Sequence, residues 1–209
     1  MNTEDIIKHV KDSIIRGRLA PGQKIVEAQL CRDLGVGRGK AREALMLLEQ
    51  EEFVRRIPNA SAVVKEVSQK DIAQIYDLLG VLEGLSMRIA APTLTETQIR
   101  KIESLVLNME RHQKDKFKIA DYNFKFHEYI TELGGNTRLV SFVNLIRAQA
   151  GRMGLHSFYN PQQVRSSLVE HRKILSAVQE RNPEKAEKYI RQHYLSAKNR
   201  LIQYINNTL

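Results

Sequence analysis

The chain has 209 residues, of which 42% are hydrophobic and 27% charged, so it can bury the core of one large domain or two small ones. Its 33 lysines and arginines outnumber 24 aspartates and glutamates, and this basic balance favours a polyanionic partner, nucleic acid before an anionic membrane. A single cysteine, Cys31, excludes an intramolecular disulfide and a cysteine-based zinc finger. No apolar run reaches the roughly 20 residues that cross a bilayer, and the N-terminus carries acidic residues, which a signal peptide avoids. We therefore expect a cytoplasmic protein.

The N-terminal third alternates short helical and β-like patterns. Thr3 can cap a first helix, whose apolar residues recur at helical spacing until Gly17 ends it. The elements expected next are a short helix over about 27–34, a third helix from about residue 37, and two β-like runs at 53–57 and 62–67 around a turn at 58–61. Three helices and a hairpin over residues 1–67 indicate a compact domain.

From residue 68 to the end the pattern stays helical. Pro92 and the pair Gly134-Gly135 mark helix ends, and Pro183 stands at the first position of the last helix. The six helices expected run over about 69–91, 95–114, 117–133, 137–155, 163–181 and 183–207, with one loop at 156–161. The sequence therefore predicts a mainly α chain, in which residues 68–209 form an all-α antiparallel bundle.

A basic cluster stands at the start of the third helix. Arg38 and Arg42 are four residues apart and share one face, with Lys40 and Gly39 in the same turn. Basic side chains oppose the helix dipole at this end, so their clustering favours a function over a merely solvated helix start, which is the alternative. A helix fits the major groove, arginine can bind guanine through two hydrogen bonds, and lysine more often contacts phosphate. We expect these four residues to contact DNA.

Residues 14–64 resemble the winged helix-turn-helix of the GntR regulators. The likeness runs through I-I-R-G-R-L-x-P-G-Q-K-I-V-E at 14–27, L-G-V-x-R at 34–38 and R-E-A-L-x-x-L-E at 42–49. Residues 68–209 resemble the FCD sensor domain of that family's FadR-like branch. The resemblance implies a sequence-specific transcription regulator, more often a repressor, that binds a double-stranded operator as a homodimer and responds to a small effector.

The chain departs from the GntR pattern at three places near the DNA. Residues 37–40 read Gly-Arg-Gly-Lys where the family usually has Ser-Arg-Thr-Pro. Glu52 replaces the usual glycine before the wing, and Ala60-Ser61 replaces the usual Arg-Gly at the wing tip. These differences argue against a minor-groove contact by the wing tip.

Three histidines each lie on the apolar face of a different helix. They are His127, with Asn123 one turn before it, His171 and His193. One inward histidine is more often a hydrogen-bonded core residue, but three on separate helices favour a shared site, since bundle cores commonly build metal sites in this way. A metal site and hydrogen-bonded core histidines both remain open on the pattern alone.

The FCD resemblance implies that these residues bind metal. The family often has D-x-x-x-H, then E-H, then a last His, and this chain has N-F-K-F-H at 123–127, E-H at 170–171 and His193. Asn123 in place of Asp adds no charge, so it should weaken metal binding and leave the full cation charge to attract an anionic effector. Three imidazoles suit Zn²⁺ or Ni²⁺ better than Mn²⁺.

The resemblance also implies that a small carboxylate effector completes the metal coordination. Arg147 is our candidate for the second contact to that organic acid, with a surface arginine as the alternative. Leu79 stands where the family often has an arginine, four residues before the glutamate of the first sensor helix, here Glu83. The effector is therefore not expected to be held in the family's commonest way.

Two other functions compete with a regulator. A histidine-bound metal with an open position could activate water in a hydrolase, but no acid or base accompanies the histidines at a recognisable spacing. A nonspecific basic protein would bind DNA weakly and with strong salt dependence. We therefore expect no enzyme, and as partners operator DNA, an organic acid and a second copy of the chain, but no membrane.

Overall fold

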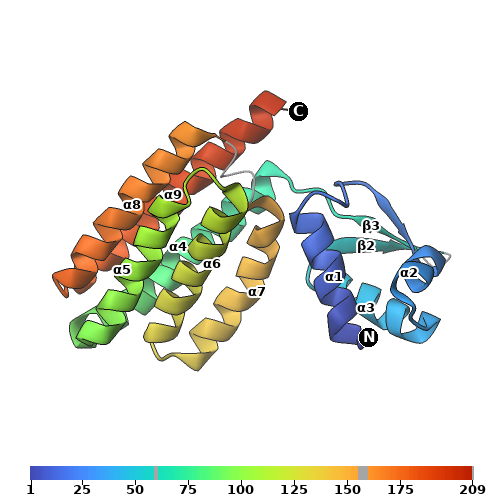
Figure 1. The fold of residues 1–209 in the computed structure, drawn as a ribbon, viewed down its shortest axis with the longest axis horizontal. Helices are drawn as coiled ribbons and strands as arrows, with labels where there is room; N and C mark the ends of the chain where they lie inside the picture. The colour runs from blue at the N-terminus through green and yellow to red at the C-terminus, as the bar shows by residue number, and fades with distance from the viewer. Residues whose placement is uncertain (59–60, 155–159, 209) are drawn as a thin grey trace. The chain divides into compact units, whose positions relative to one another are not determined.

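The computed structural model describes residues 1–58, 61–154 and 160–208 (Figure 1). They form two compact units, of which the first contains residues 1–68 and 151–153 and the second the remaining described residues. The mainly α fold expected from the sequence is confirmed, with helices in both units and one small sheet in the first.

The first unit consists of three helices and three short strands. They are α1 (Thr3–Ile15), β1 (Lys24–Val26), α2 (Glu27–Leu34), α3 (Arg38–Gln50), β2 (Val54–Ile57) and β3 (Ser61–Val64). The strands form an antiparallel sheet in the order β1-β3-β2. The sequence predicted only the β2–β3 hairpin; β1 was missed because three residues are too few to show an alternating pattern. It pairs with β3, where Ile25 lies opposite Ala62.

The cap of α1 differs from the one expected. Asn2, not Thr3, precedes the helix, and its side chain accepts a hydrogen bond from the backbone of Asp5 at 2.8 Å. The Asp5 carboxylate in turn accepts from the Asn2 backbone at 2.9 Å, which completes a capping box. The Thr3 hydroxyl donates instead to Glu43 on α3. The prediction of Thr3 as the cap was therefore wrong by one residue.

The second unit is a helical bundle, and all six helices expected from the sequence are present. They are α4 (Gln69–Ala90), α5 (Glu96–Arg111), α6 (Lys116–Leu133), α7 (Thr137–Gly154), α8 (Pro161–Gln179) and α9 (Pro183–Thr208), with a short 3-10 helix, η1 (Ala91–Thr93), after α4. Residues 151–153 of α7 are assigned to the first unit. Asn160 caps α8, and most of the loop expected at 156–161 lies outside the described residues. No described helix is long and apolar enough to cross a bilayer.

Two glycines let α4 and α9 pack closely against each other (Figure 1). A Cβ atom built on Gly80 would lie 3.2 Å from the Cβ of Tyr194, and one on Gly84 would lie 3.3 Å from the side chain of Arg191. Both distances are shorter than ordinary van der Waals contact. The close approach brings Glu83, which lies between the two glycines on α4, next to the side chains of α9.

We predict that Glu52→Gly stabilises the protein. Glu52 has a φ of +68°, and a residue with a Cβ atom costs about 1–2 kcal/mol there while glycine does not. Its ion pair with Lys65 is exposed, so losing it costs little. After the larger unfolded-state entropy of glycine is subtracted, we expect a gain of roughly 1 kcal/mol in the free energy of unfolding. Urea denaturation measures it.

The matched control is Glu52→Ala, which removes the same ion pair and keeps the Cβ atom in the left-handed conformation. It should give no gain. Equal stability of the glycine and alanine variants would contradict the argument from backbone strain.

Candidate functional site

The basic cluster expected to contact DNA lies on the first turn of α3. Gly37 is the N-cap without a side-chain hydrogen bond, and the helix begins at Arg38. The exposed residues of this turn are Arg38, Gly39, Lys40 and Arg42. The opposite side of α3 packs into the core through Ala41, Ala44, Leu45 and Leu48. The helix therefore buries its apolar face and presents its basic face to solvent.

Arg42 is held by a buried acid on the preceding helix. Its Nε atom donates to Oε2 of Glu27 on α2 at 3.4 Å, and the Glu27 side chain is 5% exposed against 63% for Arg42. Because Nε is used, the two Nη groups of the guanidinium remain for an outside acceptor. Lys40 lies near the start of the chain, with Nζ 3.4 Å from the carbonyl oxygen of Met1.

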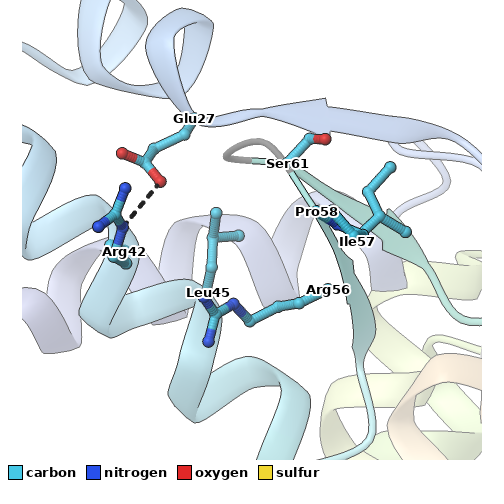
Figure 2. Close-up of a pocket in the computed structure, with 7 residues that line it drawn as sticks. All are labelled: Glu27, Arg42, Leu45, Arg56, Ile57, Pro58 and Ser61. Atoms are coloured by element: carbon cyan, nitrogen blue, oxygen red, sulfur yellow. Dashed lines mark hydrogen bonds and ion pairs between the residues drawn. The ribbon is translucent and has the colours of Figure 1, made fainter.

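A cleft of about 340 Å³ lies between α3 and the wing (Figure 2). Its lining residues are Glu27, Arg42, Leu45, Arg56, Ile57, Pro58 and Ser61. Arg56 was not predicted as a site residue, although two adjacent arginines inside an otherwise apolar strand were a signal. Of the wing-tip residues considered above, Ala60 lies outside the described residues and Ser61 is buried.

The three predicted histidines converge inside the second unit. His127 on α6, His171 on α8 and His193 on α9 are all buried, and one ring nitrogen from each lies within 4.8 Å of the others. The ring centroids are 4.5 Å apart for His171 and His193 and 5.2 Å apart for His127 and His193. The structure therefore brings together side chains that lie far apart in the sequence.

Each histidine uses its Nδ1 atom for a hydrogen bond to an oxygen. The Nδ1 atoms of His127, His171 and His193 lie 2.7 Å from Glu83 Oε2, 2.8 Å from the Ser167 carbonyl and 2.8 Å from Glu170 Oε2. A ring that donates from Nδ1 carries its lone pair on Nε2. The Nε2 atom of His171 is buried and without a hydrogen-bond partner in the described part of the chain. This arrangement is typical of metal ligands oriented by outer partners.

The environment of His171 and His193 favours neutral imidazole rings. Burial, and then the charges of His193 and His127, lower the pKa of His171 well below 6.5. Burial also lowers the pKa of His193, against the hydrogen bond to Glu170, which raises it. Neutral imidazole is the form that binds a metal ion.

Two carboxylates that orient the histidines are each paired with an arginine. Glu83 on α4 is fully buried and accepts from Arg147 Nη2 and from the Tyr194 hydroxyl, both at 2.7 Å. Burial alone would raise the pKa of Glu83, but the charges and hydrogen bonds of His127 and Arg147 outweigh it and lower that pKa.

Glu170 is placed in the same way on the other side of the cluster. It accepts from the two Nη groups of Arg200 at 2.6 and 2.9 Å. Burial would raise the pKa of Glu170, but His193 and Arg200 together lower it to about 2. Both carboxylates are therefore ionised at neutral pH, and each is balanced by the positive charge of an arginine.

Arg147 is a buried residue of α7, so the alternative of a surface arginine is wrong. Besides Glu83, its Nη2 atom contacts the His127 carbonyl at 3.0 Å and the Thr131 hydroxyl at 2.6 Å. Its Nε atom is buried and has no hydrogen-bond partner among the described residues. Nη1 donates to Asn144 at 3.3 Å, which leaves its second N–H and the Nε N–H for another acceptor. A contact from Arg147 to an effector remains a prediction.

The two other residues singled out beside the histidines have simple positions. Asn123 is half-buried on α6, one turn before His127, and its side chain makes no hydrogen bond within the described residues. Leu79 is buried in the core and offers no polar atom to a ligand.

Comparisons with known proteins agree with this architecture. Residues 2–64 match the family model "Bacterial regulatory proteins, gntR family", and residues 74–196 match the FCD domain. An uncharacterized HTH-type transcriptional regulator of Bacillus subtilis, YdhC, is 24% identical over 88% of this chain and 84% of its own length. The HTH-type transcriptional repressor RspR of Escherichia coli is 24% identical over 91% of this chain and 84% of its own.

The fold also matches a solved structure. Escherichia coli McbR/YncC superposes with a TM-score of 0.83 at 20% identity, covering 96% of this chain and 97% of that one. At this identity the likeness establishes the arrangement of the helices and strands.

We predict that Arg147→Met destabilises the second unit. It leaves the fully buried Glu83 without its arginine, and breaking a buried pair on one side costs about 3–5 kcal/mol. The double variant Glu83→Gln/Arg147→Met removes both charges and should be more stable than the single variant. Urea denaturation followed by helical circular dichroism measures both. If Arg147→Met is as stable as the wild type, the arginine is not structural and is free for an effector.

Proposed function

Because this chain belongs to the GntR family of bacterial regulatory proteins and carries an FCD domain, we propose that it is an operator-binding repressor controlled by a small carboxylate effector. The family makes it a DNA-binding transcription regulator. The proposed control by an effector rests on the cluster of three buried histidines. Each ring uses Nδ1 for a hydrogen bond to a protein oxygen, so that its Nε2 atom can bind a ligand.

DNA contact is assigned to the first turn of α3. Arg38 and Arg42 reach base edges in the major groove, where arginine can bind guanine through two hydrogen bonds. Lys40 contacts a phosphate as a point charge. Gly39 has no side chain, so its backbone N–H at the helix N-terminus can approach a phosphate.

In the proposed homodimer, a second copy of the chain supplies a second α3 helix for DNA contact. An apolar stripe on α4, made of Leu78, Val81, Leu85 and Ile89, recurs every three or four residues and is 39–51% exposed. Contiguous exposed apolar side chains are typical of protein interfaces. In the proposed homodimer this stripe is covered by the partner. A two-fold symmetric dimer binds a DNA site that is an inverted repeat. Selection of binding sites from random duplexes detects such a repeat.

We predict that the full-length chain selects an inverted repeat from duplexes with roughly 30 randomised base pairs, about three helical turns. A contacted base pair is worth about 1–3 kcal/mol, so Arg38→Ala and Arg42→Ala should each weaken binding to the selected duplex by roughly tenfold or more. Lys40→Ala should weaken selected and scrambled duplexes alike and reduce the salt slope by about one. Quantitative gel shifts measure all three.

Lys101→Ala is the control, since it removes one exposed positive charge from α5 in the other unit. It should bind like the wild type. If both arginine variants keep wild-type affinity, α3 does not read the operator.

The effector site is assigned to the metal cluster. His127, His171 and His193, with the amide oxygen of Asn123, would hold one divalent cation, Zn²⁺ or Ni²⁺ by the preference of imidazole. The bound cation would supply a positive charge for the carboxylate of the effector. The Glu83–Arg147 and Glu170–Arg200 pairs are each neutral as pairs, so the protein would leave the cation's charge for that anion. Arg147 would make the second carboxylate contact.

We predict that Zn²⁺ or Ni²⁺ raises the melting temperature of the metal-stripped chain, because a ligand that binds only the folded state stabilises it by an amount set by free ligand over Kd. His171→Ala should lose the shift on adding metal. Asn123→Asp should enlarge it, because a carboxylate is a stronger ligand than an amide. Differential scanning fluorimetry and the metal content of the purified protein are the measurements.

His112→Ala is the control, because His112 lies at the end of α5, outside the cluster. It should keep the full shift. If neither the wild type nor Asn123→Asp responds to either metal, the cluster is not a metal site, while the DNA-binding assignment is unaffected.

A further inference from the structure

Two neighbouring arginines on β2 face opposite sides of the sheet. Arg55 lies opposite Val63 and Arg56 opposite Ala62 on β3, and successive strand residues point to alternate faces. Only Arg56 lines the cleft, and its side chain extends from the strand toward α3 (Figure 2). Its backbone N–H donates to Glu49 of α3 at 2.8 Å. Arg56 is therefore held beside α3, whereas Arg55 points to the other face of the sheet.

The cleft has a net positive charge. The guanidinium of Arg56 is exposed and makes no ion pair within the described residues. Glu27 is the acid in the lining, but its carboxylate is buried against Nε of Arg42. Two arginines against one glutamate leave one positive charge, and the Arg42 side chain is 63% exposed.

The shape of the cleft suits a compact anion. Its floor is buried and consists of Glu27, Leu45 and Ser61, and its rim includes the exposed residues Arg42, Arg56 and Pro58. Ligand pockets usually measure about 300–1,000 Å³. A cleft of about 340 Å³ with Arg42 and Arg56 in its lining is large enough for a phosphate group and carries two guanidinium side chains.

We propose that this cleft binds one phosphate of the DNA backbone, with Arg56 as the contacting residue of the wing. The inference rests on the DNA binding proposed above and adds a second point of attachment to it. Guanidinium binds phosphate through parallel N–H···O bonds. Such contacts fix the position of the protein on the duplex without reading sequence. The contact comes from the wing strand, so it does not need the Arg-Gly that the wing tip lacks.

A free phosphorylated metabolite would present the same chemistry to Arg56. The cleft is bordered by Arg42, which belongs to the basic turn of α3. A duplex whose major groove receives that turn brings a backbone phosphate to the edge of the groove. This position favours the phosphate of DNA over that of a small molecule.

The test compares Arg56→Gln with Arg55→Gln in the full-length protein. Both variants remove one positive charge from adjacent positions of β2, so they change long-range electrostatics equally and differ only in the cleft. The probes are the duplex selected by the wild type and a scrambled duplex of the same length. Fluorescence anisotropy gives the affinity over a range of salt concentrations, and thermal melting confirms that each variant is folded.

We expect Arg56→Gln to weaken binding to both duplexes by a similar factor and to reduce the salt slope by about one relative to Arg55→Gln. The selected sequence should not change. Arg56→Lys should keep the slope and lose part of the affinity, because lysine keeps the charge without the planar fork. It also serves as the informative variant if Arg56→Gln does not fold.

Three results would overturn the proposal. If the wild type binds neither duplex, the proposed function fails and the contact fails with it. If the wild type binds but Arg56→Gln or Arg56→Lys behaves like Arg55→Gln, only the phosphate contact fails. If inorganic phosphate raises the melting temperature of the wild type but not of Arg56→Gln, while both glutamine variants bind DNA equally, the cleft is a small-anion site instead.

Discussion

One buried carboxylate connects most of the helical unit. Glu83 of α4 is fully buried and contacts His127 of α6, Arg147 of α7 and Tyr194 of α9. A charge taken out of water is tolerated only when hydrogen bonds and an opposite charge replace the lost hydration. The three helices must therefore keep these side chains in place around α4. The Glu83 carboxylate can only accept a hydrogen bond from His127, so the proton of that ring lies on Nδ1. Both the packing of the helices and the state of the histidine cluster therefore depend on Glu83.

The protein itself holds the three histidine rings in place. The partners of its Nδ1 atoms are two carboxylates and one carbonyl, and both carboxylates are bonded to arginines. Rings held in this way lose little further freedom when they bind a ligand, which lowers the entropic cost of binding. Glu170 is next to His171 in the chain but orients His193 on another helix, so the outer contacts also join α8 to α9.

The sequence predicted the parts of the fold that depend on local pattern. The helical period, Gly134 and Pro183 predicted the helices and several of their ends, and the inward faces of three helices predicted that the histidines share a site. It did not reveal what depends on distant pairing. Glu83 is separated from His127 by 44 residues and from Tyr194 by 111, and no local spacing indicates that they meet. The pairing of Arg147 with Glu83 and the position of Arg56 in a cleft were missed for the same reason.

The close packing of α4 on α9 has a consequence for how such a sensor can change during evolution. A methyl group at Gly80 would press on Tyr194, whose hydroxyl holds Glu83 and lies 3.2 Å from Nδ1 of His127. Metal–ligand distances tolerate deviations of only about 0.2 Å. If the cluster holds the proposed cation, a substitution at a small residue that touches no ligand would therefore alter the selectivity of that site. Natural variants of the proposed sensor would then respond at a different effector concentration because the spacing between α4 and α9 has changed, while every residue that faces the effector stays the same.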